Sequence, residues 1–498
     1  MEKDKENIQK YKVHSVKYNA LMNIILRVSS VIFPLITFPY ATRVLGASSY
    51  GLVNFVTSVV SYFALVASLG IPAYGIRKCA EVRDAPQKLA ENVKELLVIN
   101  TISLVITYIA FIVILRLVGR FWNNRVLFLI SSSAIILQTF GVEWFYEAIE
   151  QYDYITLRNI AFKFVSLILL FAFVHSTADV IAYCGITVVG TVGSNILNII
   201  RLPKYVDIKE KTKLNLKQHL KPVFTLFFYY AATTIYTNLD TVMLGFMTNN
   251  AVVGYYNSAV KVKTVLVSLI TALGAVALPR ISYYLGRNEI ESFKKLIRSS
   301  FGYAFYISLP LAAYFSVEAR PVLLFLAGKE YSPAISAMQI ITPSIVFIGI
   351  GSVTAYQMLI PLKRDDYTML GAVVGALVDL ILNSIFIPKY GAAGAALGTL
   401  VAEISVVCVH CVALRDLLPL VIDKLEFLKI LLSTGISTAV MVLVCNMLQI
   451  NNYFAECACS VCVFGVCYIL SGIIMKIQTE KDILISVLQK LRMYRNKK

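Results

Sequence analysis

Three cationic side chains, Arg27, Lys261 and Lys263, interrupt long apolar runs of this 498-residue chain. A charge inside a hydrocarbon layer costs at least ~2.5–3.5 kcal/mol, so such a residue usually faces a polar cavity or a partner. Arginine binds a phosphate through paired hydrogen bonds, whereas lysine binds it as a point charge. The three residues therefore predict a cavity for a multivalent anion that is attached to an apolar group.

The two lysines have a second interpretation. Lys261 and Lys263 are two positions apart, which is about 200° around a helix, so they do not share one face. A lysine at the edge of a lipid-facing surface can extend its ammonium group to the lipid head groups instead. Both interpretations stay open at the level of the sequence.

Oxygen-bearing side chains occupy a second set of positions in apolar runs: Asp240, Asp379, Asn383, Thr399 and Glu403. Asp379 and Asn383 are four residues apart, as are Thr399 and Glu403, so each pair shares one helix face. Such oxygens bind a hard cation or relay a proton, which predicts coupling to Na⁺ or H⁺. The alternative is that each carboxylate pairs with a nearby lysine. No other cofactor is expected.

An acidic and aromatic run, Glu143–Glu150, follows another apolar stretch. Its aromatic residues Trp144, Phe145 and Tyr146 are interpreted as anchors at the membrane interface. Glu147 is a candidate gate residue that would face Arg77, and a solvated helix end is the alternative. The nine cysteines lie mostly in apolar runs, where a thiol is usually a small hydrophobe, so no structural metal is expected.

The composition fixes the class of protein that must position these residues. Hydrophobic residues make up 58% of the chain and charged residues 15%, against about 25% charged residues in a typical soluble domain. A soluble chain of this composition would expose large apolar patches. The composition thus excludes a soluble enzyme, a disordered chain and a nucleic-acid-binding module, and it predicts an all-α polytopic membrane protein.

A spanning helix needs about 20 apolar residues, and the hydropathy pattern predicts fourteen of them. They cover residues 19–40, 51–72, 96–118, 126–147, 160–175, 180–200, 223–247, 253–278, 301–319, 335–360, 368–387, 392–413, 428–449 and 453–475.

These spans divide the chain into two six-helix lobes and an added pair. A similar order of residues at Leu45–Asn54 and Leu244–Asn257 indicates an internal repeat, which is common in alternating-access transporters. The predicted parts are an N-terminal segment (1–18), a first lobe (19–200), a basic linker (201–222), a second lobe (223–413), a helix pair (414–475) and a basic tail (476–498).

The positive charge follows the predicted topology. The chain carries a net charge of +17, and only seven of its 46 Lys and Arg residues lie in the segments predicted to face outward. Because cytoplasmic loops are enriched in Lys and Arg, both termini are predicted to be cytoplasmic. The charge therefore reflects orientation and not a nucleic-acid partner.

Several motifs in order give the chain a resemblance to bacterial polysaccharide flippases of the multidrug/oligosaccharidyl-lipid/polysaccharide exporter superfamily. The motifs are Arg43–Gly51, Tyr74–Arg77, Glu143–Glu150 with Ile155–Arg158, Asn238–Gly245, Gly254–Asn257, Leu382–Ala396 and Glu403.

The resemblance implies a fourteen-helix, two-lobe protein of the bacterial cytoplasmic membrane that carries an undecaprenyl-pyrophosphate-linked oligosaccharide, such as an O-antigen or capsule repeat unit, to the outer leaflet. It implies a pyrophosphate site at Arg27, with Lys261 and Lys263 where related lipid II flippases have an arginine on the eighth span. It also implies Na⁺ coordination by Asp240, Asp379, Asn383 and Thr399.

Two other functions compete with a flippase. One is a drug/cation antiporter of the same superfamily, which normally has twelve spans. The other is a membrane glycosyltransferase or polymerase, which usually needs a large outer loop, whereas the longest predicted outer stretch here is about 320–334. A non-enzymatic, monomeric transporter in contact with membrane lipids is expected.

Overall fold

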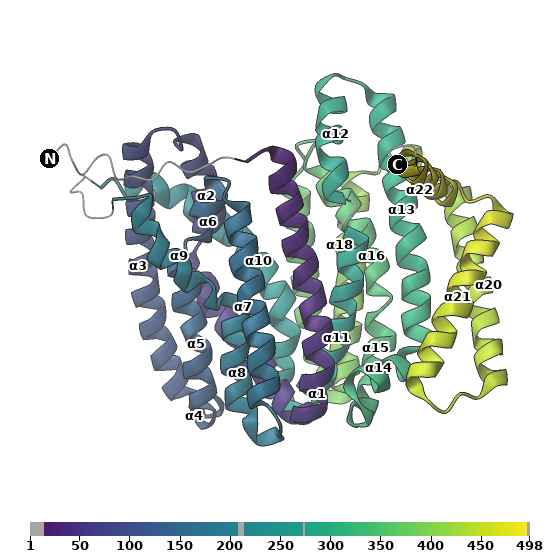
Figure 1. The fold of residues 1–498 in the computed structure, drawn as a ribbon, viewed down its shortest axis with the longest axis horizontal. Coiled ribbons are helices and arrows are strands. Elements are labelled where there is room, and N and C mark those ends of the chain that lie inside the picture. The colour runs from purple at the N-terminus through teal and green to yellow at the C-terminus, as the bar shows by residue number, and fades with distance from the viewer. Residues whose placement is uncertain (1–13, 208–213, 272–273, 496–498) are drawn as a thin grey trace. The chain divides into compact units, whose positions relative to one another are not determined.

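The computed structural model describes residues 14–207, 214–271 and 274–495, and every regular element within them is a helix (Figure 1). The chain separates into two compact units, Met1–Gly245 (unit 1) and Phe246–Lys498 (unit 2). The all-α polytopic class predicted from the sequence is confirmed. The predicted segment 1–18 lies almost wholly outside the described residues.

Unit 1 is built from ten α-helices, of which the last ends two residues beyond the unit boundary. They are α1 (Val16–Ser68), α2 (Ile71–Glu81), α3 (Pro86–Leu117), α4 (Gly119–Asn123), α5 (Arg125–Phe140), α6 (Glu143–Ala148), α7 (Tyr152–Phe173), α8 (Val180–Val188), α9 (Asn195–Arg201) and α10 (Lys217–Met247). A π-helical turn, η3 (Val189–Gly193), connects α8 to the region of α9.

The first two predicted spans form one continuous helical element. A 53-residue α1 would be about 80 Å long if it were straight, far more than a bilayer needs. The element is broken at Gly46, whose φ of 71° and ψ of 172° are not helical. Glycine adopts a positive φ at little cost, so the chain passes from one span to the next through a single residue.

Unit 2 contains the remaining helices and ends with a helix in the segment expected only as a basic tail. Its elements are α11 (Asn250–Thr271), α12 (Gly274–Gly286), α13 (Ile290–Val317), α14 (Ala319–Ala327), η5 (Lys329–Ala334), α15 (Ile335–Ile341), α16 (Ser344–Ser352), η6 (Val353–Leu359), α17 (Asp366–Tyr390), α18 (Ala392–Ala413), α19 (Leu418–Val421), α20 (Lys424–Leu448), α21 (Tyr453–Met475) and α22 (Gln478–Arg495).

Nine helices in the described part of the chain are long and apolar enough to cross a membrane, or up to eleven if each of two bent pairs is one span. The bent pairs, Thr177–Gly193 with Asn195–Lys204 and Lys329–Ile341 with Ser344–Leu359, match the sixth and tenth predicted spans. The fifth span begins at Tyr152 rather than at residue 160.

The boundary between the units differs from the one predicted at the basic linker. The helix of the seventh predicted span, α10, belongs almost entirely to unit 1. A Cβ atom on Gly70 would lie 2.3 Å from the carbonyl oxygen of Val223, and a Cβ atom on Gly245 would lie 2.0 Å from the Phe55 ring. Two glycines thus allow α10 to pack closely against neighbouring parts of unit 1.

The aromatic residues predicted to anchor the chain at the membrane interface lie in the core instead. Trp144, Phe145 and Tyr146 are at most 5% exposed and pack with residues such as Ile71 and Val223. The Tyr146 hydroxyl donates to the carbonyl oxygen of Asn198 at 2.9 Å. The anchor interpretation is therefore wrong, because these rings join α2, α6, α9 and α10 inside unit 1.

The added helix pair of unit 2 is also held by specific contacts. Helices α20 and α21 lie side by side (Figure 1), and the Ser433 and Ser471 hydroxyls are 2.6 Å apart. The Glu426 carboxylate accepts hydrogen bonds from the backbone N–H groups of Gln478 and Thr479, at 3.2 and 2.9 Å. This carboxylate fixes the start of α22 to α20.

A buried polar network joins α2, α3 and α10 in unit 1. His219 is fully buried, and its Nε2 lies 2.6 Å from a Glu95 carboxylate oxygen while its Nδ1 lies 2.9 Å from the Tyr74 hydroxyl. The Gln218 side chain donates to the same carboxylate at 3.0 Å. Each of these polar side chains has a hydrogen-bond partner, so the network stabilises the start of α10.

We predict that His219→Leu destabilises the protein by about 3 kcal/mol, because it leaves the Glu95 carboxylate and the Tyr74 hydroxyl buried without their partner. The measurement is the melting temperature of the purified protein in detergent. His175→Leu is the matched control, since His175 is exposed. Equal melting temperatures for the two variants would contradict the structural role given to His219.

Candidate functional site

The guanidinium group of Arg158, on α7, is buried inside unit 1. The Arg158 side chain is 2% exposed, and its Nη2 forms an ion pair with the Glu143 carboxylate at 3.1 Å. Its Nη1 donates to Ser194 Oγ at 3.0 Å and to Asn195 Oδ1 at 2.9 Å. These contacts join α6, α7 and α9 around one cation, which is the expected way to hold a charge within a membrane.

A second cation of α7 reaches toward α1. The Lys163 ammonium group donates to the hydroxyls of Ser29 and Ser30 at 3.1 and 2.8 Å. Lys163 is half-buried and follows Arg158 by five residues, so it lies more than one helical turn further along α7. Both hydroxyl acceptors are neutral, and the Glu143 carboxylate, which forms an ion pair with Arg158, also attracts Lys163 electrostatically.

Arg27 lies on the same stretch of α1 as the two serines. It is exposed, and its Nε donates to Asn23 Oδ1 at 3.0 Å, four residues earlier on the helix. Glu147 interacts electrostatically with both Arg27 and Arg158. Unit 1 thus gathers cations of α1 and α7 with acidic residues of α6, and we call Arg27, Glu143, Glu147, Arg158 and Lys163 the charged cluster of unit 1.

The predicted gate partner Arg77 does not join this cluster through a hydrogen bond or an ion pair with Glu147 among the described residues. Arg77 is exposed on α2, and its guanidinium lies 5.7 Å from the centre of the Tyr74 ring. The end of the acidic run is held differently: Glu150 forms an ion pair with Arg83 and accepts a hydrogen bond from Asn19 at 3.1 Å.

In unit 2, α11 carries Lys261 and Lys263 on either side of its packed face. Val262 between them is buried, and both lysines are half-buried. Because the segment is an α-helix, the two ammonium groups leave it on different sides, as the spacing predicts. The structure gives neither lysine an ion-pair partner within the part of the chain that it describes.

Two of the predicted cation ligands, Asp379 and Asn383, lie in unit 2 where α17 packs along α18. Asp379 and Asn383 are at most 1% exposed. A Cβ atom on Gly398 would lie 2.3 Å from Asn383 Oδ1 and 3.1 Å from Asp379 Oδ1. The next residue, Thr399, has its hydroxyl 2.9 Å from the hydroxyl of Tyr256, which comes from α11.

We call these four side chains the oxygen cluster of unit 2: the Asp379 carboxylate and the Asn383 amide, which lie beside Gly398, and the paired hydroxyls of Thr399 and Tyr256. Hard cations prefer such oxygen ligands, and a single carboxylate matches a single positive charge. Across the described ranges no group of three or more His, Cys, Asp or Glu side chains is placed to hold a metal ion. The donor set therefore suits a monovalent cation better than a divalent one.

The other two predicted acidic residues also lie on helices. Asp240 is buried at 5% exposure in α10, and Glu403 is half-buried on α18, one turn after Thr399. Their proposed role in cation coupling stays a prediction.

Arg158 and Lys163 were missed as site residues by the sequence analysis, because Arg158 precedes the span predicted at 160–175 and Lys163 lies near the start of that span. That span was only 16 residues long, shorter than the ~20 residues that crossing requires. Extending it toward its N-terminus gives the observed 22-residue α7 and brings Arg158 into the same helix as Lys163. The contact of Tyr256 with Thr399 was also missed, because an apolar helix face gives no indication of where a phenol hydroxyl points.

The chain matches the family model described as "Polysaccharide biosynthesis protein" over residues 16–285, more than half of its length. Among curated proteins it is 24% identical over 417 residues to a putative O-antigen transporter of Escherichia coli (strain K12), which covers 81% of this chain and 97% of that protein. A putative O-antigen transporter of Shigella dysenteriae is 24% identical over 394 residues, or 79% of this chain and 98% of that one.

Solved structures show the same fold. The lipid II flippase MurJ in an inward closed conformation superposes with a TM-score of 0.69 at 18% identity, over 92% of this chain and 99% of that chain. An inward-facing multidrug resistance MATE family transporter of the MOP superfamily gives a TM-score of 0.59 at 14% identity, over 80% and 98%.

We predict that Gly398→Ala destabilises the protein by about 1–3 kcal/mol, because the new methyl group overlaps the Asn383 amide between α17 and α18. Gly435→Ala is the matched control: nothing lies within 4 Å of a Cβ atom there, so helix propensity alone applies and favours alanine. Melting temperatures in detergent distinguish the two variants. A Gly398→Ala protein as stable as the control would show that α17 and α18 do not pack as described.

Proposed function

The chain belongs to the polysaccharide biosynthesis protein family, and we propose that it is a flippase that moves lipid-linked oligosaccharide repeat units across a membrane for surface polysaccharide biosynthesis. The observation that carries this proposal is the charged cluster of unit 1. Three cations on two apolar helices are costly in hydrocarbon unless they serve an anionic substrate or a partner. Arg158 has the Glu143 carboxylate as its ion-pair partner, whereas Lys163 donates hydrogen bonds to neutral hydroxyls and shares the electrostatic attraction of the same Glu143 carboxylate.

The substrate we propose is an oligosaccharide on undecaprenyl pyrophosphate. A diphosphate carries several negative charges next to an apolar chain, and Arg27 and Lys163 offer a guanidinium and an ammonium group for it. In unit 2, the partly buried Lys261 and Lys263 offer two more. The protein would open alternately to the two membrane faces, so that the cations receive the head group on one side and release it on the other.

The topology we propose has fourteen spans with both termini in the cytoplasm of a bacterial cell. The broken α1 supplies two spans, and the two bent pairs supply one each. Helices α10 and α11, with 31 and 22 residues, are long enough to cross although they are less apolar than the other spans. The protein would act as a monomer in the cytoplasmic membrane.

We also propose that transport is coupled to a monovalent cation at the oxygen cluster of unit 2. Asp379, Asn383 and Thr399 supply a carboxylate, an amide and a hydroxyl at buried positions of two packed helices. A cation bound there would be attracted to the Asp379 carboxylate, because opposite charges within a membrane stabilise each other. Na⁺ and H⁺ both carry the positive charge that this attraction requires.

The second candidate function is a drug/cation antiporter. Its support is the fold alone, because a MATE family transporter superposes over 98% of its own length. That match covers 80% of this chain, whereas the match to MurJ covers 92%. A flippase accounts better for the longer chain and for the family.

We predict that Arg27→Gln and Lys163→Gln each slow the flipping of a fluorescent lipid-linked oligosaccharide by about tenfold, since each removes a charge-assisted hydrogen bond to the diphosphate worth roughly 1.5–3 kcal/mol. The measurement is the rate at which a membrane-impermeant quencher gains access to the lipid in proteoliposomes. Arg125→Gln serves as the control, because Arg125 lies at the start of α5 beside Trp122 and outside the cluster. Unchanged rates in both test variants would contradict the proposed site, and drug export without lipid flipping would favour the antiporter.

For cation coupling, we predict that flipping accelerates several-fold under an imposed Na⁺ or H⁺ gradient and that Asp379→Asn abolishes this acceleration, because the amide cannot neutralise a bound cation. Asp366→Asn, at the exposed start of the same helix, keeps the acceleration. Separate gradients identify the ion. A wild-type rate that is indifferent to both gradients would reject coupling while leaving the flippase assignment intact.

A further inference from the structure

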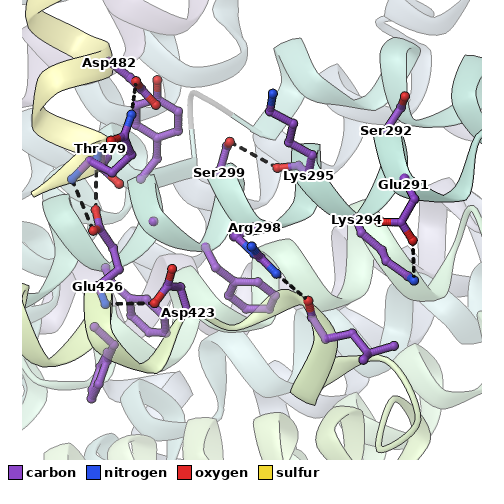
Figure 2. Close-up of a pocket in the computed structure, with 17 residues that line it drawn as sticks. Glu291, Ser292, Lys294, Lys295, Arg298, Ser299, Asp423, Glu426, Thr479 and Asp482 are labelled. Carbon is purple, nitrogen blue, oxygen red and sulfur yellow. Dashed lines mark hydrogen bonds and ion pairs between the residues drawn. The ribbon is translucent and has the colours of Figure 1, made fainter.

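A cavity of about 740 Å³ lies within unit 2 between α13, the α19–α20 segment and the start of α22 (Figure 2). Its volume is within the range of ~300–1,000 Å³ that small-molecule sites occupy. It shares none of its lining residues with the charged cluster of unit 1 or the oxygen cluster of unit 2. The proposed transport therefore gives it no role.

One wall of the cavity is cationic and comes from the first turns of α13. Lys294 forms an ion pair with Glu291 at 2.8 Å, but the Glu291 side chain is 87% exposed. The Arg298 Nη2 donates to the carbonyl oxygen of Leu420 at 3.0 Å, which uses one of the five N–H groups of a guanidinium. No acceptor for the Lys295 ammonium is found in the described part of the chain. Lys295 and Arg298 thus keep donors for a ligand.

The facing wall is anionic, and its carboxylates are positioned by the backbone and by one side chain. Asp423 accepts from the N–H groups of Leu425 and Glu426, both at 3.1 Å. Glu426 caps α22 as described above, and Asp482 accepts from the Gln478 side chain at 2.8 Å. A carboxylate has about four acceptor sites, so each of the three retains acceptor capacity.

No ion pair joins the two walls among the residues that the structure describes, although the cations and carboxylates line the same cavity. Figure 2 shows Arg298 across from Asp423 and Glu426. The lining holds three cations against four carboxylates, counting Glu291. An anion alone would be repelled by one wall and a cation alone by the other. A molecule that carries both charges satisfies both walls.

The charges of the two walls decide which end of such a molecule lies on which side, and aromatic residues from both walls also line the cavity. Phe305 and Phe427 are in edge contact, with ring centres 4.9 Å apart, and both line the cavity. Aromatic faces attract an ammonium group, and Phe427 directly follows Glu426 in the chain. The ammonium group therefore fits the α20–α22 side, and a phosphate fits Lys295 and Arg298.

We infer that this cavity binds an ethanolamine phosphate group, with its phosphate on α13 and its primary ammonium on the carboxylates of α20 and α22. A zwitterionic phospholipid provides this group, and so does free phosphoethanolamine. Leu420, Leu425 and Leu428 are 48–64% exposed on α19 and α20, which gives acyl chains an apolar surface near the cavity. The site tethers a lipid head group where α22 joins the helix pair.

The test uses the full-length protein in detergent, titrated with phosphatidylethanolamine or phosphatidylglycerol of the same acyl chains and followed by native mass spectrometry. We expect phosphatidylethanolamine to bind about tenfold more tightly, since phosphatidylglycerol lacks the ammonium group. Arg298→Gln weakens this binding about tenfold, and Asp482→Asn removes the preference between the two lipids. Arg287→Gln, an exposed site outside the cavity, leaves both affinities unchanged.

Competition separates the two sources of the group. Displacement of the lipid by free phosphoethanolamine at comparable concentration assigns a soluble ligand, whereas displacement only at a hundredfold excess assigns the phospholipid. Inorganic phosphate that competes as well as phosphoethanolamine, or equal affinity of the wild type for both lipids, would overturn the inference. The melting temperature of each variant shows whether it is folded, and binding is measured without transport, so the flippase proposal can fail independently.

Discussion

The constraint on which the whole structure depends is that a polar group in hydrocarbon must find its partner within the protein, because no water is available there. Arg158 meets it through Glu143, Ser194 and Asn195, and many hydroxyls meet it by donating to the carbonyl four residues earlier, as Thr42 does to Phe38. The same constraint makes the remaining charges informative. A cation such as Lys163, which donates to neutral hydroxyls and shares one carboxylate with Arg158, retains an attraction for an anion.

Much of the architecture could be predicted from the sequence because long apolar runs are limited by the thickness of a bilayer. The all-α class, the positions of most spans and the shared face of Asp379 and Asn383 follow from the period of a helix and the length of each run. The exact ends of the spans could not be predicted in this way. A charged residue such as Arg158 is typical of a loop unless its ion-pair partner is known. Local sequence carries no information on partners that are distant along the chain.

The aromatic run at Trp144–Tyr146 is a second case in which a local sequence pattern did not determine where the side chains pack. Aromatic residues at the end of an apolar run are typical of a membrane interface, but the helix that contains them turns into the protein and packs on α2 and α10. Propensity cannot distinguish these outcomes, since both bury the rings away from water. Likewise, Gly398 and Thr399 gave no indication that Tyr256 from α11 would lie beside them.

Because α1 is broken at the single residue Gly46, the connection between its two parts is short. Two helical parts that meet at one glycine leave only a short stretch around Arg43 and Ser48 exposed to an antibody, a phage or a protease. In the proposed topology that junction faces the surroundings of the bacterium. At this junction the protein would then present little polypeptide to the outside.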